Sequence, residues 1–168
     1  GRAARERGRD PAGVRLVAVS KTVPAEAIRE VHALGQRDFG ENYVQEAAAK
    51  MASLADLADI RWHLIGPLQS NKAAIAASGF AWVQTVDRAK IAARLAAARP
   101  VDMTPLSVCI QVNASGEASK SGVTPGEVVG LARVVAGLPQ LRLRGIMGIP
   151  EPTADTKRRR AQLRVLRD

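Results

Sequence analysis

Residues 15–21 read Arg-Leu-Val-Ala-Val-Ser-Lys, and Pro24 opens an alanine-rich segment directly after them. The apolar run at residues 16–19 contains two β-branched valines, which is typical of a strand. A continuous apolar strand that leads at once into a helix predicts a parallel strand buried on both faces. The sequence therefore predicts an α/β fold in which Lys21 stands at the C-terminal end of the first strand.

The position of Lys21 gives it a candidate role. Loops at the C-terminal ends of parallel strands form the ligand crevice of open α/β sheets and the active face of barrels. A lone amine flanked by apolar residues is expected to be partly desolvated, which lowers a lysine pKa and frees the amine to attack a carbonyl. A solvated lysine that simply ends a strand is the alternative interpretation, and this segment alone leaves both open.

The same strand–helix unit recurs along the chain without consecutive hairpins. Such alternation predicts a parallel sheet with helices packed outside it. Expected strands follow at residues 37–41, 61–65, 81–86, 106–112 and 141–149, and expected helices at 24–34, 43–57, 71–78, 88–98 and 125–136, with a basic helical segment reaching residue 168.

Two architectures are compatible with such a sheet, a closed barrel and an open doubly wound sheet. A (β/α)₈ barrel typically needs about 250 residues and eight units, whereas this chain of 168 residues contains six. By count alone an open doubly wound sheet is favoured, because an unclosed barrel leaves strand edges bare. No Gly-x-Gly-x-x-Gly run follows the first strand, so dinucleotide binding lacks its main sequence support.

Composition narrows the function classes. The length suits a single domain, residues 1–168, and no apolar run approaches the roughly 20 residues of a membrane span. The first ten residues are charged and do not resemble a signal peptide, so we expect a cytoplasmic protein. The single cysteine, Cys109, excludes an intrachain disulfide, and its apolar neighbours suggest a small buried residue.

The formal net charge of +9 raises the question of nucleic-acid binding. Only residues 157–160, Lys-Arg-Arg-Arg, form a basic cluster, and no aromatic residue is interleaved with it for base stacking. We therefore expect a solvated helix face and no specific nucleic-acid partner. A protein- or RNA-binding module that uses the basic ends of the chain is kept as an alternative.

Polar residues fall where the expected strands end. Asn42 either caps the next helix or faces a ligand, and Asn71 is expected to cap the helix after the third strand. His63 lies within a strand and points opposite to Trp62, and a buried, hydrogen-bonded structural histidine is the commoner role there. Residues 113–123 form a loop rich in small polar residues, and loops of this composition often bind a ligand.

The chain offers little support for other catalytic sites. Its two histidines and one cysteine lack the spacing of a metal site, so no metal is expected. No Ser–His or Cys–His pair of a nucleophilic hydrolase is recognisable. At the end of the last expected strand, Gly148 in Met-Gly-Ile-Pro permits the close approach of a flat ligand.

Six segments together resemble the pyridoxal phosphate homeostasis protein family, and they follow the family's order along nearly the whole chain. They are LVAVSK (16–21), DFGENYVQE (38–46), WHLIGPLQSNK (62–72), VDR (86–88), QVNASGEASKSGV (111–123) and RGIMGIP (144–150). The second and third are specific enough to make chance agreement remote.

The resemblance implies a (β/α)₈ TIM barrel of the alanine racemase N-terminal type, of which about six units are present in this chain. It implies that pyridoxal 5′-phosphate is held as a Schiff base on Lys21, with Asn42 beside the cofactor. Val19, His63 and Met147 are implied as residues of the pocket wall. The family continues through two further strands that hold the cofactor phosphate, so we expect this chain to bind the cofactor poorly by itself.

The resemblance further implies a noncatalytic carrier of intracellular vitamin B6 homeostasis. Family members lack the second domain that supplies the opposing catalytic base of alanine racemase. Pyridoxal phosphate-dependent apoenzymes are candidate recipients, and the oligomeric state is left open. The alternative is a weak racemase-like enzyme that works through Lys21.

Overall fold

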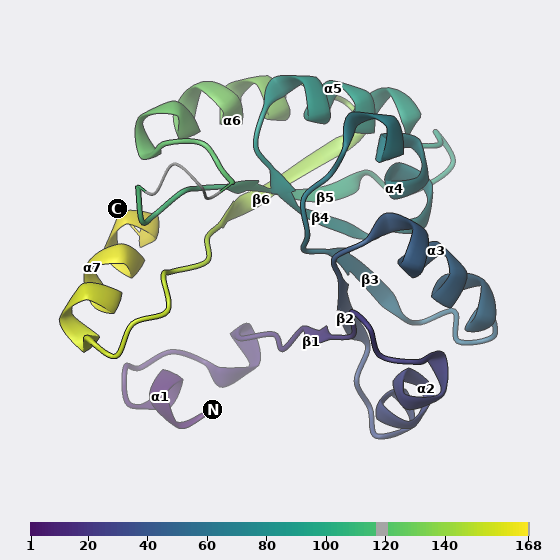
Figure 1. Cartoon of the computed structure of the whole chain (residues 1–168), viewed down its shortest axis with the longest axis horizontal. Helices are drawn as coiled ribbons and strands as arrows, with labels where there is room; N and C mark the ends of the chain where they lie inside the picture. Colours follow the sequence, from purple (N-terminus) through teal and green to yellow (C-terminus); the bar gives the residue numbers. More distant parts are fainter. Residues whose placement is uncertain (117–120, 168) are drawn as a thin grey trace.

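The computed structural model describes residues 1–116 and 121–167. Six parallel strands form one sheet in the order β1-β2-β3-β4-β5-β6, and helices cover its convex side (Figure 1). The strands are β1 (Ala18–Val19), β2 (Asp38–Glu41), β3 (Arg61–Leu64), β4 (Trp82–Val86), β5 (Leu106–Gln111) and β6 (Leu141–Met147). The helices between them are α2 (Ala25–Ala33), α3 (Val44–Ser53), α4 (Ala73–Gly79), α5 (Ala89–Ala98) and α6 (Val128–Ala136).

The remaining helices occupy the ends and connections of the chain. They are α1 (Arg2–Arg5) and α7 (Thr156–Arg167) at the ends, and the 3₁₀ turns η1 (Pro11–Gly13), η2 (Ser70–Lys72) and η3 (Pro125–Glu127). Helices α1 and α7 lie on the left in Figure 1, on the open side of the curved sheet and away from the helices of its convex side. Among the described residues, no helix is long and apolar enough to cross a membrane.

The predicted alternation of six strands and helices is confirmed, but the preference for a doubly wound sheet is wrong. Every strand pairs in parallel with the next one in sequence, and the order never reverses. A doubly wound sheet requires such a reversal to place helices on both faces. Because each crossover here runs in the same direction, the helices gather on one face and the sheet curves as part of a barrel.

The core lies between the sheet and its outer helices. Along β5, Leu106, Val108 and Ile110 are buried, whereas Ser107, Cys109 and Gln111 alternate with them and are only partly buried. Each of the helices α3, α4 and α5 buries at least one alanine completely (Ala47, Ala76, Ala77 and Ala92), and these small side chains let the helices approach the strands closely. The high alanine content thus contributes to the core, and Cys109 is less buried than predicted because it faces the concave side.

The first strand does not meet the expectation of burial on both faces. Only Ala18 and Val19 form β1, Leu16 is 73% exposed and Val19 is 53% exposed. Among the described strands β1 pairs with β2 alone, so its other edge and its concave face have no cover. Strand β6, at the opposite edge, is likewise mostly exposed or partly buried.

Neither predicted helix cap forms. Helix α3 has Tyr43 at its N-cap, so Asn42 lies one residue before the capping position. Asn71 lies inside η2, which leads directly into α4, and neither helix receives a side-chain cap. Asn42 is therefore available for the alternative role, that of facing a ligand.

Candidate functional site

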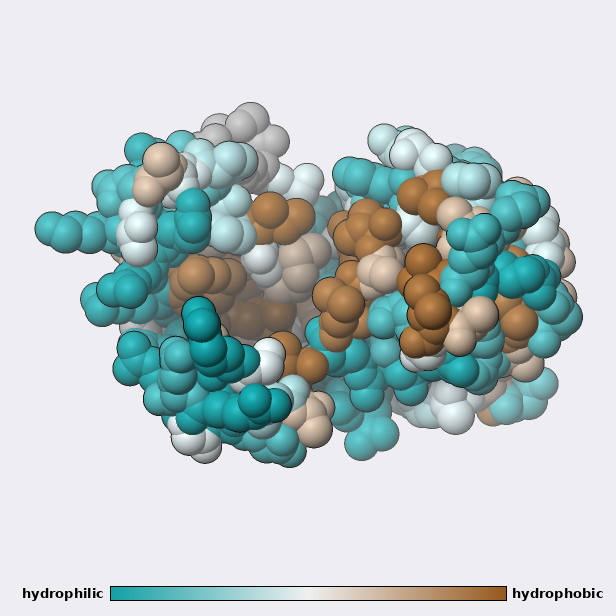
Figure 2. All heavy atoms as spheres, turned by 90° about the horizontal axis from the view of Figure 1, so that it is seen from below, coloured by the Kyte–Doolittle hydropathy of each residue, from teal (hydrophilic) through white to brown (hydrophobic). Residues whose placement is uncertain are grey.

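A cavity of about 370 Å³ opens at the C-terminal ends of the strands, on the concave side of the sheet. Its wall is mostly aliphatic, with one amine and two amides. The lining residues are Val17, Val19, Lys21, Asn42, Ile65, Gln84, Met147, Gly148 and Ile149. In the space-filling view, apolar side chains gather around the deep hollow between the two ends of the molecule (Figure 2). The volume falls in the range of small-molecule sites.

The structure brings together most of the residues singled out from the sequence. Lys21, Asn42 and Met147 line this cavity, and so does Val19. They come from the ends of three different strands, the arrangement that gives barrel sites their chemistry. Residues 117–120, within the loop expected to bind a ligand, lie outside the described residues.

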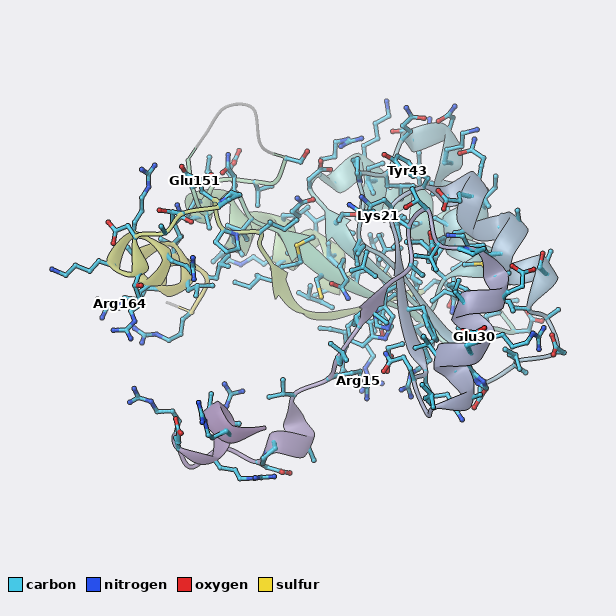
Figure 3. All side chains as sticks on the ribbon, turned by 60° about the horizontal axis from the view of Figure 1, so that its bottom comes forward. Arg15, Lys21, Glu30, Tyr43, Glu151 and Arg164 are labelled. Carbon is cyan, nitrogen blue, oxygen red and sulfur yellow. The ribbon has the colours of Figure 1, made fainter. Side chains whose placement is uncertain are left out.

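Lys21 lies in the turn that follows β1, and its side chain is exposed. The prediction that the Lys21 amine is partly desolvated is therefore wrong. Among the described strands, β1 pairs with β2 alone, and its unpaired edge leaves one side of Lys21 open to solvent. Figure 3 shows Lys21 near the end of the sheet where Tyr43 begins α3, with Arg15 toward the opposite end. The amine is thus accessible to a ligand that enters the cavity.

Directly beneath this turn lies an ion-pair network that sequence reasoning missed. Glu41 is fully buried, and its Oε1 accepts hydrogen bonds from Ser20 Oγ at 2.6 Å and from Lys50 Nζ at 2.9 Å. Lys50 Nζ also donates to the carbonyl oxygen of Ser20 and to Glu46 Oε1, each at 2.7 Å. The i, i+4 spacing of Glu46 and Lys50 was the one available signal, and it does not reveal the buried partner on β2.

The network controls the charge of Lys50. Burial by itself lowers the pKa of the Lys50 ammonium, but the hydrogen bonds to Glu46 and Glu41 outweigh it and raise the pKa above the ordinary value. The hydrogen bond from Lys50 in turn lowers the pKa of the Glu46 carboxyl. Lys50 is therefore a protonated structural cation, distinct from the accessible amine of Lys21.

His63 is buried and hydrogen-bonded, as predicted, but it lies outside the lining of the Lys21 cavity. Its Nε2 lies 2.9 Å from Asp38 Oδ1, and the Gln84 amide lies 3.0 Å from its Nδ1. Because an amide nitrogen donates, Nδ1 accepts and Nε2 carries the hydrogen that is donated to Asp38. The ring stacks on Trp82 at 5.5 Å between centroids and lines a neighbouring cavity of about 400 Å³.

Electrostatics around His63 favour its neutral form. Burial lowers the pKa of His63, and this effect exceeds the opposing influence of Asp38. Burial would raise the pKa of Asp38, but hydrogen bonds from Arg61 and His63 hold it below the usual range. Arg61 binds Asp38 with two nitrogens, at 2.8 and 2.6 Å. The group holds three strands together beneath the site.

We predict that stability falls on mild acidification and that His63 causes part of the fall. The pKa of His63 is lower in the folded than in the unfolded chain, so the unfolded chain binds more protons. The contribution of His63 to the unfolding free energy is therefore present above about pH 6.5 and is lost as the pH decreases. For one such group the unfolding free energy changes by at most about 1.4 kcal/mol per pH unit. Asp38 acts in the same direction, but only near and below about pH 4.

Urea unfolding at pH 7.5 and 5.5 measures this effect. We expect the unfolding free energy of the wild type to decrease more between these values than that of His63→Gln, which retains a donor toward Asp38 without a titrating ring. Equal decreases in the two proteins would contradict the assignment.

Asn42 forms the partition between the Lys21 cavity and another of about 420 Å³. The second cavity carries Lys72 and Arg88 in its wall, and Arg88 is paired with Asp87 at 2.6 Å. Gly66 fixes the partition, since a Cβ there would lie only 2.3 Å from the backbone oxygen of Asn42. Within residues 1–116 and 121–167, no cluster of three His, Cys, Asp or Glu side chains is suited to a metal.

Comparison with known proteins agrees with this geometry. The sequence matches the family described as alanine racemase, N-terminal domain, over residues 2–168. It is 58% identical over 166 residues to the pyridoxal phosphate homeostasis protein of Pseudomonas aeruginosa, covering 99% of this chain and 72% of that protein. It is 51% identical over 150 residues to the protein of the same name from Escherichia coli, covering 88% of this chain but only 64% of the relative.

Solved structures show the same fold. PipY of Synechococcus elongatus, solved without PLP, is 41% identical with a TM-score of 0.86, and the match covers 99% of this chain and 77% of that chain. PipY with PLP bound gives 38% identity and a TM-score of 0.77, with 99% and 81% covered. Alanine racemase from E. faecalis, at 19% identity and a TM-score of 0.71, shares the fold over 96% of this chain and 44% of its own.

These matches confirm that the six strand–helix units are part of a barrel of the alanine racemase type. The chain spans between 64% and 72% of the length of the curated relatives compared above. It belongs to the alanine racemase N-terminal domain family and, within that family, to the pyridoxal phosphate homeostasis proteins.

Proposed function

We propose that this chain is a single barrel domain that binds pyridoxal 5′-phosphate covalently through Lys21 and serves in cytoplasmic vitamin B6 homeostasis. The observation that carries the proposal is the convergence of Lys21, Asn42 and Met147 on one cavity at the C-terminal ends of the strands. The names of its relatives and the PLP-bound PipY structure support the same ligand. Pyridoxal phosphate-dependent apoenzymes are the proposed recipients.

The cavity suits the aldehyde and the ring of this cofactor. Lys21 presents an exposed amine, and attachment joins its Nζ to the aldehyde carbon with the release of one water. Val17, Ile65 and Ile149 give flat aliphatic surfaces against which a ring packs, and Asn42 offers both a donor and an acceptor. When bound, the cofactor supplies an electrophilic aldehyde conjugated to an aromatic ring.

The described lining of the cavity offers fewer binding groups for the phosphate of the cofactor than for its aldehyde and ring. Among the described residues that line this cavity, Lys21 is the sole cation, and the same amine is used for attachment. Charge-assisted contacts to phosphate normally come from Arg, Lys and helix N-termini. We therefore propose that attachment through Lys21 and packing of the ring dominate the affinity of this chain.

A carrier role is favoured over racemisation by the chemistry of the cavity wall. Racemisation needs acid–base groups on both faces of the reacting carbon, because one side chain removes a proton and another returns one from the opposite side. Apart from Lys21, the described lining residues are aliphatic, sulfur-containing or amide side chains. Loss of α-deuterium from labelled alanine above the rate with free cofactor would instead favour the racemase-like alternative.

The test is an absorption spectrum of the protein with added pyridoxal phosphate, followed by borohydride reduction and peptide mapping. We expect a visible band of the attached cofactor and a reduced label on Lys21. The absence of a band, or a label scattered over the surface lysines, would contradict the proposal.

A further inference from the structure

The turn that holds Lys21 is fixed from both sides by side chains of other elements. On one side, the Ser20 carbonyl accepts from Lys50 Nζ at 2.7 Å, and Ser20 Oγ donates to Glu41. On the other side, the backbone N–H of Thr22 donates to Glu46 Oε1 at 2.7 Å. The same Glu46 oxygen accepts from Lys50, so a single connected network holds both peptide units next to Lys21.

The backbone within this turn is strained. Thr22 has a φ of 61°, and among the described residues it is the one non-glycine with a positive φ. A β-branched residue rarely adopts this conformation, and it persists only where the surroundings enforce it. The hydrogen bond from Thr22 N–H to Glu46 supplies that enforcement directly at the residue after Lys21.

The network is a poor device for stability alone. It places Glu41 at 0% exposure and the Lys50 side chain at 10%, where both charges have lost much of their hydration. Glu41 Oε2 is buried without a hydrogen-bond partner among the described residues. Apolar residues of similar volume often stabilise a core as well as a buried ion pair does. Stability alone therefore does not explain this network, and its role is found in the part of the chain that it holds in place.

We propose that Glu41, Lys50 and Glu46 are positioning residues, which lock the turn at residues 20–22 and aim the amine of Lys21 into its cavity. The inference rests on the proposed attachment of pyridoxal phosphate to Lys21. All three ammonium hydrogens of Lys50 have an oxygen partner, so Lys50 serves the turn and leaves the carbonyl chemistry to Lys21. The selectivity between the two amines is then built into the same network.

The decisive variant is Glu46→Ala, because the Glu46 side chain is partly exposed and its removal leaves the buried pair in place. We expect faster hydrogen exchange at the Thr22 amide. We also expect the rate of pyridoxal phosphate attachment to Lys21 to fall by about tenfold, since small misplacements of a reacting group are costly. Glu46→Gln keeps an acceptor oxygen for Thr22 and is expected to recover most of both losses.

Asp56→Ala provides the matched control. It removes an ion pair with Arg29 that is exposed and lies outside the network, so both readouts are expected to stay at the wild-type value. Attachment is scored as the ratio of label on Lys21 to the fraction of folded protein in each sample, so that a loss of folded protein is not counted as a loss of attachment. Lys50→Met, if it folds, is expected to show the largest drop in this ratio.

Unchanged exchange at Thr22 and an unchanged labelling ratio in Glu46→Ala would overturn the inference while leaving the proposed function intact. Wild-type protein that fails to label Lys21 would instead overturn the proposed function. In that case the exchange of the Thr22 amide, measured without any cofactor, still decides whether Glu46 fixes the turn. Faster exchange supports the network, and unchanged exchange refutes it.

Discussion

Replacement of Lys21 by alanine is expected to abolish specific attachment of pyridoxal phosphate. Among the described residues lining the cavity, Lys21 alone carries a primary amine, so no neighbour replaces the nucleophile. Lys50 lies nearby, but its ammonium is hydrogen-bonded to three oxygens and its pKa is raised. The visible band should disappear, and borohydride should leave no label in the peptide that contains residue 21.

Two further variants make this experiment specific. Lys90→Ala removes an exposed lysine at the start of α5 and is expected to leave the band and the label on Lys21 unchanged. Lys21→Arg keeps the positive charge but supplies no amine that condenses with the aldehyde, so it should lose the label as completely as alanine does. A label of wild-type intensity in Lys21→Ala, on Lys50 or elsewhere, would refute the role assigned to Lys21.

The placement of Lys21 was predictable because it follows from local patterns. An apolar run predicts the strand, Pro24 and the alanines predict the helix, and parallel topology puts the connecting turn at the ligand-binding edge. Whether the sheet curves into part of a barrel or stays open and doubly wound was not predictable from the number of strand–helix units. The outcome depends on which face of the sheet each crossover helix packs against, and strand–helix alternation is the same in the barrel and in the doubly wound sheet.

The ion-pair network beneath Lys21 was equally hidden from sequence reasoning. Glu41 lies in a strand and Lys50 in the following helix, and nine residues separate them. Their contact exists only after α3 has packed on the sheet, so neither periodicity nor capping rules contain it. The exposure of Val19 was missed for a related reason, since burial of an edge strand depends on its neighbours and not on its own composition.

Replacement of Gly66 by alanine is expected to disturb Asn42, which separates the two cavities beside Lys21, and to lower both stability and the rate of pyridoxal phosphate attachment. A Cβ at residue 66 would meet three backbone atoms of Asn42, at 2.3, 2.6 and 2.8 Å. Backbone atoms at these distances have no rotamer to change, so either Asn42 or the end of β3 must move. The carbonyl of Gly66 is itself held by a hydrogen bond from Thr85 Oγ1 on β4 at 2.7 Å, which resists movement of Gly66 away from β4.

Overpacking of this kind costs about 1–3 kcal/mol of unfolding free energy. The effect on the site should be larger, because Asn42 is the wall between the two cavities, and a displacement of about 1 Å at a reacting site lowers rates on the order of a hundredfold. Urea unfolding and the rate of pyridoxal phosphate attachment to Lys21 measure the two consequences separately.

Gly130→Ala is the matched control, since the same methyl group is added at a position in α6 where it would meet no atom within 4 Å beyond its chain neighbours and the backbone of its own helix. It should stabilise the protein by roughly 0.5–1 kcal/mol, because alanine loses less backbone entropy than glycine in a helix. Opposite signs for the two substitutions would show that the close contact at Gly66, and not the loss of glycine itself, shapes the wall beside Lys21. Wild-type stability and attachment rate in Gly66→Ala would mean that Asn42 is not held in place by this contact.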